Sequence, residues 1–292
     1  MPLSRFIIFI ALAIGSVFTS NAFAESSVWK ISKGDNYFYL GGTVHLLTAE
    51  DHPLPDEFTV AYQDSNRLFF ETDIAESQTP EFQSKFIAAM TYSNGRTLAS
   101  ELDQKTYLKL ESFMASRQVP IASFSNFEPW GVSLMVTMLE YQRLGMQPGY
   151  GVDAYFNNLA LADKKEIMNL ETGDEQLRFL SLLADIDPNV CIEYTLKDLE
   201  DLPEFITFMK KSWRNGNIEA FTEHASVKQM KKEFPAMYKA LITTRNNRWM
   251  ETLPSLIDDN VKEFVLVGTM HINGEGGLLS LLKKQGFKVE QL

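Results

Sequence analysis

The chain contains a short internal repeat in which a hydrophobic strand leads into Gly-Thr, one apolar residue and a histidine. Near the start, Tyr-Phe-Tyr-Leu-Gly-Gly-Thr-Val-His ends at His45. Near the end, Phe-Val-Leu-Val-Gly-Thr-Met-His ends at His271. The chain has only four histidines, and two of them occupy this context. Because composition alone hardly produces such a match twice, the repeat predicts that both ends of the chain contribute to one structural unit.

Further strands surround this repeat, and a long helical section separates its two copies. Short runs of apolar and β-branched residues predict strands at 28–31, 67–71, 166–171 and 287–292, beside those of the repeat. From about residue 80 to 248 apolar residues recur three and four apart, which predicts mainly helices. We therefore expect one α/β domain. Its central sheet would hold the two strand–Gly-Thr-x-His units from the chain ends, with a long helical insertion between them.

The first 24 residues have the features of an export signal. Arg5 precedes an apolar run, and Ala22-Phe23-Ala24 has the small-x-small pattern of a signal-peptidase site. The run is shorter than the ~20 residues that a membrane-spanning helix needs. The alternative is an uncleaved N-terminal anchor. We expect a signal peptide over 1–24, a single domain over 25–292, and a periplasmic or extracellular protein without stable membrane insertion after cleavage.

Composition narrows the possible partners. The 38 acidic and 27 basic residues give a net charge of −11, and no basic stripe compensates for it. Such a surface repels phosphate backbones, so nucleic acid is not an expected partner. The single Cys191 cannot form an intramolecular disulfide, so stability must come from the hydrophobic core.

The ends of the two repeat strands are candidates for a binding site. Gly42 and Gly268 allow the backbone to turn sharply or to approach a ligand closely. In α/β sheets, ligands gather at the carboxyl ends of strands. If the two strands lie side by side, His45 and His271 come together, and two imidazoles at an open site are typical metal ligands. The alternative is a pair of loop histidines that merely bond to the backbone.

Two acidic residues end other apolar strands. Glu71 and Glu171 each follow such a strand and each precede a threonine. An acid in this position is often a helix cap or a salt-bridge partner, and this alternative stays open, above all for Glu171. We favour Glu71 as a metal ligand or as the general base that takes a proton from activated water. Two histidines with such oxygen ligands suit Mn, Fe, Co or Zn.

Together these motifs resemble those of the TraB/GumN/Tiki family. The two Gly-Thr-x-His segments are similar to its two Gly-x-x-His motifs, and residues 70–73 to its acidic strand. The segment Gly-Val-Asp-Ala-Tyr-Phe around Asp153 resembles its central Gly-hydrophobic-Asp segment. The segment from Arg245 to Trp249 is similar to its Arg-Asn-x-x-Trp helix. The matches follow the family's order over residues 29–292.

The resemblance implies an α/β fold with a helical insertion and a site that holds both histidines, Glu71, Arg245 and Asn246. Tiki-type members are metal-dependent proteases, and related proteins include esterase-like enzymes and proteins that handle iron or haem. The expected function is therefore an exported metal-dependent hydrolase, above all a metalloprotease-like enzyme acting on peptides, and the expected partner is a peptide or small-molecule substrate. Arg245 would stabilise the oxyanion, and Asn246 would bind the metal or orient water. The alternative is a non-catalytic exported protein that binds a metal, haem or a peptide in the same pocket.

Overall fold

The structure is a computed structural model that describes residues 26–258 and 260–292. The expected signal peptide, residues 1–24, lies outside the described residues. No helix in these two ranges has the length and apolar character needed to cross a bilayer.

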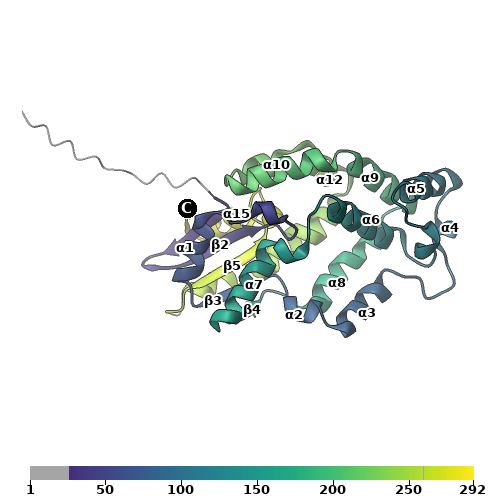
Figure 1. The fold of residues 1–292 in the computed structure, drawn as a ribbon. Coiled ribbons are helices and arrows are strands. Elements are labelled where there is room, and N and C mark those ends of the chain that lie inside the picture. The colour runs from purple at the N-terminus through teal and green to yellow at the C-terminus, as the bar shows by residue number, and fades with distance from the viewer. Residues whose placement is uncertain (1–25, 259) are drawn as a thin grey trace, which may run out of the picture.

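A six-stranded mixed sheet forms the centre of the fold, in the order β4-β3-β5-β2-β1-β6 (Figure 1). Its strands are β1 (Val28–Lys33), β2 (Asn36–Thr43), β3 (Arg67–Phe70), β4 (Glu166–Asn169), β5 (Glu263–Gly268) and β6 (Lys288–Gln291). The predicted strands agree with these to within a few residues. The expectation of a mixed α/β fold with strands at both ends of the chain is confirmed.

Strands from opposite ends of the chain are neighbours in this sheet. β2 pairs in parallel with β5, and Thr43 lies opposite Gly268. β5 also pairs in parallel with β3, which in turn pairs in parallel with β4. β1 and β6 are added antiparallel beyond β2. Because the four parallel strands end at the same edge, the segments that follow them converge there.

The central strands β2, β3 and β5 are buried on both faces, because helices cover each face, whereas the edge strands β4 and β6 are largely exposed. In β5, Phe264 belongs to one hydrophobic core and Val265 to the other, as the alternation of side chains along a strand requires. The first core includes α1 (Asp56–Asp64) and α7 (Val152–Asp163). The second includes α15 (Leu278–Lys284). Burial on both faces explains why β5 is apolar almost throughout.

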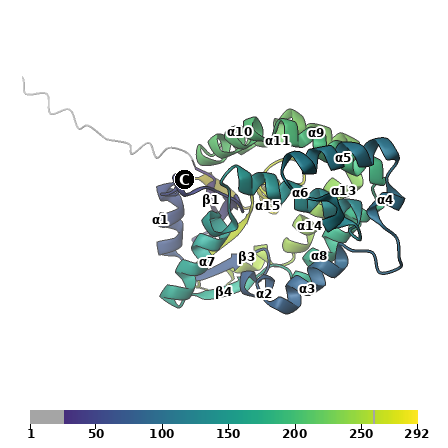
Figure 2. The ribbon, with the colours of Figure 1, turned by 45° about the vertical axis from the view of Figure 1, so that its right-hand side comes forward.

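The remaining helices include those of the section predicted between residues 80 and 248, and Figures 1 and 2 show most of them extending away from the sheet. They are α2 (Ile74–Ser77), α3 (Pro80–Ala89), α4 (Leu98–Glu101), α5 (Gln104–Ser116), α6 (Pro129–Arg143), α8 (Gly173–Ser181), α9 (Pro188–Glu200), α10 (Leu202–Arg214), α11 (Ile218–Glu223), α12 (Ala225–Glu233), α13 (Pro235–Tyr238) and α14 (Arg245–Trp249). Several prolines open these helices, as at Pro129 in α6 and Pro188 in α9, where a missing N–H costs nothing. The section is interrupted where α7 and β4 return to the sheet, and α10 also returns to it and bonds Gly42 of β2 through Trp213.

Candidate functional site

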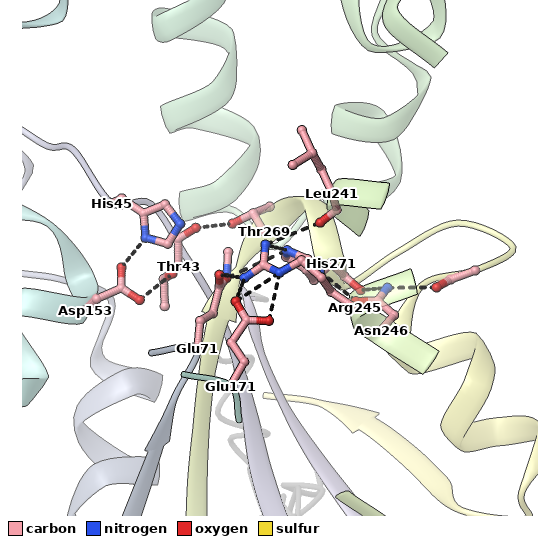
Figure 3. Close-up of polar contacts among 12 residues, drawn as sticks. Thr43, His45, Glu71, Asp153, Glu171, Leu241, Arg245, Asn246, Thr269 and His271 are labelled. Carbon is pink, nitrogen blue, oxygen red and sulfur yellow. Dashed lines mark hydrogen bonds and ion pairs between the residues drawn. The ribbon is translucent and has the colours of Figure 1, made fainter. Parts of the chain in front are cut away.

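The segments that follow the four parallel strands meet α14 at one edge of the sheet (Figure 3). His45 follows β2, Glu71 follows β3, Glu171 follows β4 and His271 follows β5. Side chains from both ends of the chain therefore face one another. A cavity of about 380 Å³ opens here, lined among others by both histidines, Glu71, Arg245 and Gly268. A larger cavity, of about 1300 Å³ between α5 and α9, contains none of the predicted site residues.

The Arg245 guanidinium occupies the centre of this arrangement, and the residue as a whole is 7% exposed. Nε donates to both oxygens of Glu171, at 3.1 and 3.0 Å. Nη2 donates to Glu171 Oε1 and to Glu71 Oε2, each at 2.5 Å. Nη1 donates to the Leu241 carbonyl at 3.3 Å and to His271 Nε2 at 3.1 Å. Since a guanidinium carries five N–H donors, every one of them is engaged.

The two glutamates respond differently to this shared cation. Burial by itself would raise the pKa of Glu71, but the charge of Arg245 and the Gly268 N–H hold it well below its usual value. Burial raises the pKa of Glu171 despite its bonds to Arg245. Glu71 is therefore the firmly ionised member of the pair, and it is the one that lines the cavity.

His271 is buried and held in one tautomer. Its Nδ1 lies 2.6 Å from Asn246 Oδ1, while Asn246 Nδ2 donates to the carbonyls of His271 and Gly276 at 3.1 and 2.8 Å. The amide oxygen must therefore accept, so Nδ1 carries the proton and Nε2 presents a lone pair. Burial lowers the pKa of His271 to about 3, which keeps the ring neutral. Nε2 lies 3.9 Å from Glu71 Oε1, and the ring packs on Trp249 with centroids 4.4 Å apart.

His45 is exposed but is also fixed through Nδ1. This atom lies 2.8 Å from Asp153 Oδ2, and Thr43 Oγ1 donates to the other Asp153 oxygen at 2.9 Å. The attraction of Asp153 raises the pKa of His45 to about 9. The His45 side chain is 60% exposed, so solvent screens part of this attraction.

Gly268 provides the space in which these groups converge. Its N–H donates to Glu71 Oε1 at 2.6 Å. A Cβ at this position would lie 3.1 Å from both His45 Nε2 and Glu71 Oε1. The absence of a side chain at Gly268 therefore lets the imidazole of one strand end approach the carboxylate of another.

The other predicted residues lie behind the side chains that line the cavity. Glu171, Asn246 and Asp153 do not line the cavity, and each bonds to a residue that does. For Glu171 the structure has the salt bridge that the sequence left open, while Thr172 caps α8. Gly42 packs closely against Ile272 and lies outside the cavity lining.

Three contributors were not predicted from the sequence. Thr43 supports Asp153, and Thr269 Oγ1 donates to the Thr43 carbonyl at 2.8 Å, which ties the two strand ends together. Both threonines belong to the repeated Gly-Thr-x-His segment, so the repeat itself contained their signal. The Leu241 carbonyl could not be recognised from the sequence, because it is a backbone group. A single π-helical turn over Lys239–Thr244 brings it to Arg245.

The side chains of His45, His271 and Glu71 are of the chemical types that bind divalent metals. Each Nδ1 is held by a side-chain oxygen, and this outer support is typical of metal-binding histidines. His271 Nε2 lies 3.9 Å from Glu71 Oε1. Because the pKa of His45 is raised to about 9, a metal has to displace the proton on His45 Nε2 before this atom can bind it. Within residues 26–258 and 260–292, no three His, Cys, Asp or Glu side chains are already spaced as ligands. Arg245 bonds the lone pair of His271, so a metal needs that hydrogen bond to be released.

The structure defines the class of protein: a mixed α/β protein with a cluster of buried charged side chains at the carboxyl edge of its parallel strands. The chain belongs to the TraB/PrgY/gumN family, whose model matches residues 27–291. It is 22% identical over 250 residues to the uncharacterized protein YbaP of Escherichia coli (strain K12), covering 86% of this chain and 89% of that protein. YbaP of Shigella flexneri matches with the same identity and coverage. No solved structure matches the chain.

Proposed function

We propose that this protein is an exported metal-dependent hydrolase that acts on peptides. The observation that carries the proposal is the convergence of His45 Nε2, His271 Nε2 and Glu71 Oε1 beside Gly268. Within the proposal, the two Gly-Thr-x-His segments act as one unit, and each supplies one imidazole.

The roles follow from the contacts of each side chain. His45, His271 and Glu71 hold a divalent ion of the Mn, Fe, Co or Zn type. When bound, such an ion polarises the substrate carbonyl and activates water. Glu71 suits a ligand better than a base, because its lowered pKa gives it little affinity for a proton.

The outer residues position these ligands. Asp153 and Asn246 fix the two rings through Nδ1, and Glu171 holds Arg245. Arg245 has no free N–H while it bonds His271. Release of that one bond frees both the His271 lone pair and an N–H that can stabilise the oxyanion of the attacked carbonyl.

The decisive experiment measures hydrolysis against metal content. The chain is purified without chelators, its metals are quantified, and cleavage of an unstructured peptide is followed before and after chelation. We expect chelation to abolish cleavage and one of Mn, Fe, Co or Zn to restore it. His45→Ala should lose both metal and activity, whereas His52→Ala, a histidine bonded to the Tyr150 carbonyl, should keep both.

Two outcomes would contradict this proposal. Cleavage that persists in metal-free protein would show that hydrolysis does not depend on a metal. Binding of a metal or a peptide with no hydrolysis would favour a non-catalytic exported binding protein that uses the same cavity.

Export is part of the proposal and rests on the apolar run and the Ala-Phe-Ala pattern that ends at Ala24. Mass spectrometry of the protein from its host should give an N-terminus at Glu25. An N-terminus that retains Met1 would indicate a membrane-tethered protein instead.

A further inference from the structure

A second cavity, of about 460 Å³, opens beside the candidate site between helices α6, α9, α10 and α12. We call it the side pocket. Four residues line both the side pocket and the site cavity: Tyr141, Met209, Phe221 and Met270. Met270 stands between Thr269 and His271 in the chain. The side pocket therefore lies next to the space in front of His271, and these four side chains stand between the two cavities.

Most of the side-pocket wall is apolar. Met209, Phe221 and Val227 are part of the hydrophobic core, and Phe205 and Met270 pack against it. Methionine side chains adapt to irregular shapes, so a wall containing them accepts more than one bulky apolar group. A volume of about 460 Å³ lies within the ~300–1,000 Å³ range of pockets that bind small ligands.

The side pocket also carries two acidic side chains and, among its described lining residues, no basic one. Asp198 and Asp201 are exposed, and neither forms a salt bridge within the described ranges. Partial burial raises the pKa of Asp198 to about 6, against the charge of Lys197, which lowers it, and Asp201 and Glu233 add to the rise. These carboxylates would gain from a nearby cation.

We propose that the side pocket is a substrate subsite, which accepts a bulky apolar side chain beside the scissile bond while Asp198 and Asp201 attract a neighbouring basic residue. This inference rests on the hydrolase function proposed above. It assigns the substrate class as peptides in which an apolar residue stands next to a lysine or an arginine.

Four matched peptides test the inference. They differ at two adjacent positions, which contain Phe or Ala and then Lys or Glu. We expect Phe to raise kcat/KM over Ala by ~10-fold or more, since discrimination by one apolar group spans ~10–200-fold. Lys should exceed Glu by a few-fold, the size expected for partly exposed charge pairs.

Two variants assign these preferences to the side pocket. Thr195→Trp on α9 fills the pocket and should remove the preference for Phe while cleavage of the Ala peptides continues. Asp198→Asn is nearly isosteric and should remove only the preference for Lys. Asp35→Asn, an acid just before β2 and so at the opposite end of this strand from His45, should keep both preferences. Thermal unfolding checks that each variant is folded.

The outcomes separate this inference from the hydrolase proposal. Equal cleavage of all four peptides would overturn the subsite and leave the hydrolase intact. If no peptide is cleaved, the hydrolase fails, and fluorescence anisotropy with the same labelled peptides then decides about the subsite. Tighter binding of the Phe-Lys peptide, lost in Thr195→Trp, supports it, and equal binding of all four contradicts it.

Discussion

At the scale of single residues, Arg245 joins the largest number of polar partners at the candidate site. One buried guanidinium bonds two glutamates, a backbone carbonyl and a neutral imidazole. Burial lowers the pKa of Arg245, but Glu71 and Glu171 outweigh this effect and raise it. The cation is therefore permanent, and it allows two carboxylates to share a buried space.

Replacing Arg245 tests how far this cation stabilises the fold. Arg245→Met leaves Glu71 and Glu171 buried without a cation, so we expect the free energy of unfolding to fall by ~3–5 kcal/mol. Urea denaturation measures the change. Arg248→Met is the matched control, because Arg248 pairs with Glu175 where the Arg248 side chain is exposed, and it should cost ~1 kcal/mol or less. Similar losses in both variants would show that the buried network adds no stability.

A change at Glu71 separates chemistry from packing. Glu71→Gln keeps the size of the side chain and an oxygen that can accept from Gly268, but it removes the negative charge. We expect hydrolysis to fall by at least ~10²-fold, because loss of a residue that only supports a metal ligand already costs ~10–100-fold and Glu71 is proposed as a ligand itself. Glu175→Gln serves as the control in the same assay. Full activity of Glu71→Gln would exclude Glu71 both as a metal ligand and as a base.

At the scale of elements, the ends of the strands decide where the reactive atoms lie. β5 ends at Gly268, and the following residues Thr269–His271 form one 3₁₀ turn that directs His271 inward. Thr269 bonds the end of β2, which holds the His45 segment in place. The π-helical turn before α14 presents the Leu241 carbonyl to Arg245. Such π-helical turns often occur at functional sites.

Gly268→Ala tests whether close approach at this strand end matters. The added Cβ would lie 3.1 Å from His45 Nε2 and Glu71 Oε1, so both groups must move by a few tenths of an ångström. Because second-layer disturbances of a metal site typically cost ~10–100-fold, we expect metal affinity or activity to fall by that factor. Gly149→Ala adds its Cβ where no atom lies within 4 Å and should change neither. Isothermal titration with metal, together with the peptide assay, provides the measurement.

At the scale of the whole molecule, the sheet brings together segments that are far apart in the sequence. β2 and β5 lie side by side although more than two hundred residues separate them. The helical section between them covers the site and supplies Arg245 and the side pocket. A ligand that contacts both His45 and His271 therefore links the two ends of the chain.

This linkage predicts that the bound metal stabilises the entire fold. A ligand that binds only the folded state adds ~2.7 kcal/mol at one hundred times its dissociation constant. We expect the midpoint of thermal unfolding to rise when the active metal is added to metal-free protein. His45→Ala should abolish the rise, and His52→Ala should retain it. An equal rise in His45→Ala would place the metal elsewhere.

The sequence by itself determined the strands, the mixed α/β class and the positions of most candidate residues. Local patterns are sufficient for these, because strand alternation, strand-end glycines and a repeated Gly-Thr-x-His segment are properties of neighbouring residues. Only the tertiary structure decided which groups touch. The contact of Arg245 with both glutamates and His271, the support of His45 by Asp153, and the side pocket beside Met270 all join distant segments. The geometry of these contacts depends on how the helices pack against the sheet, and this packing cannot be predicted from patterns of neighbouring residues.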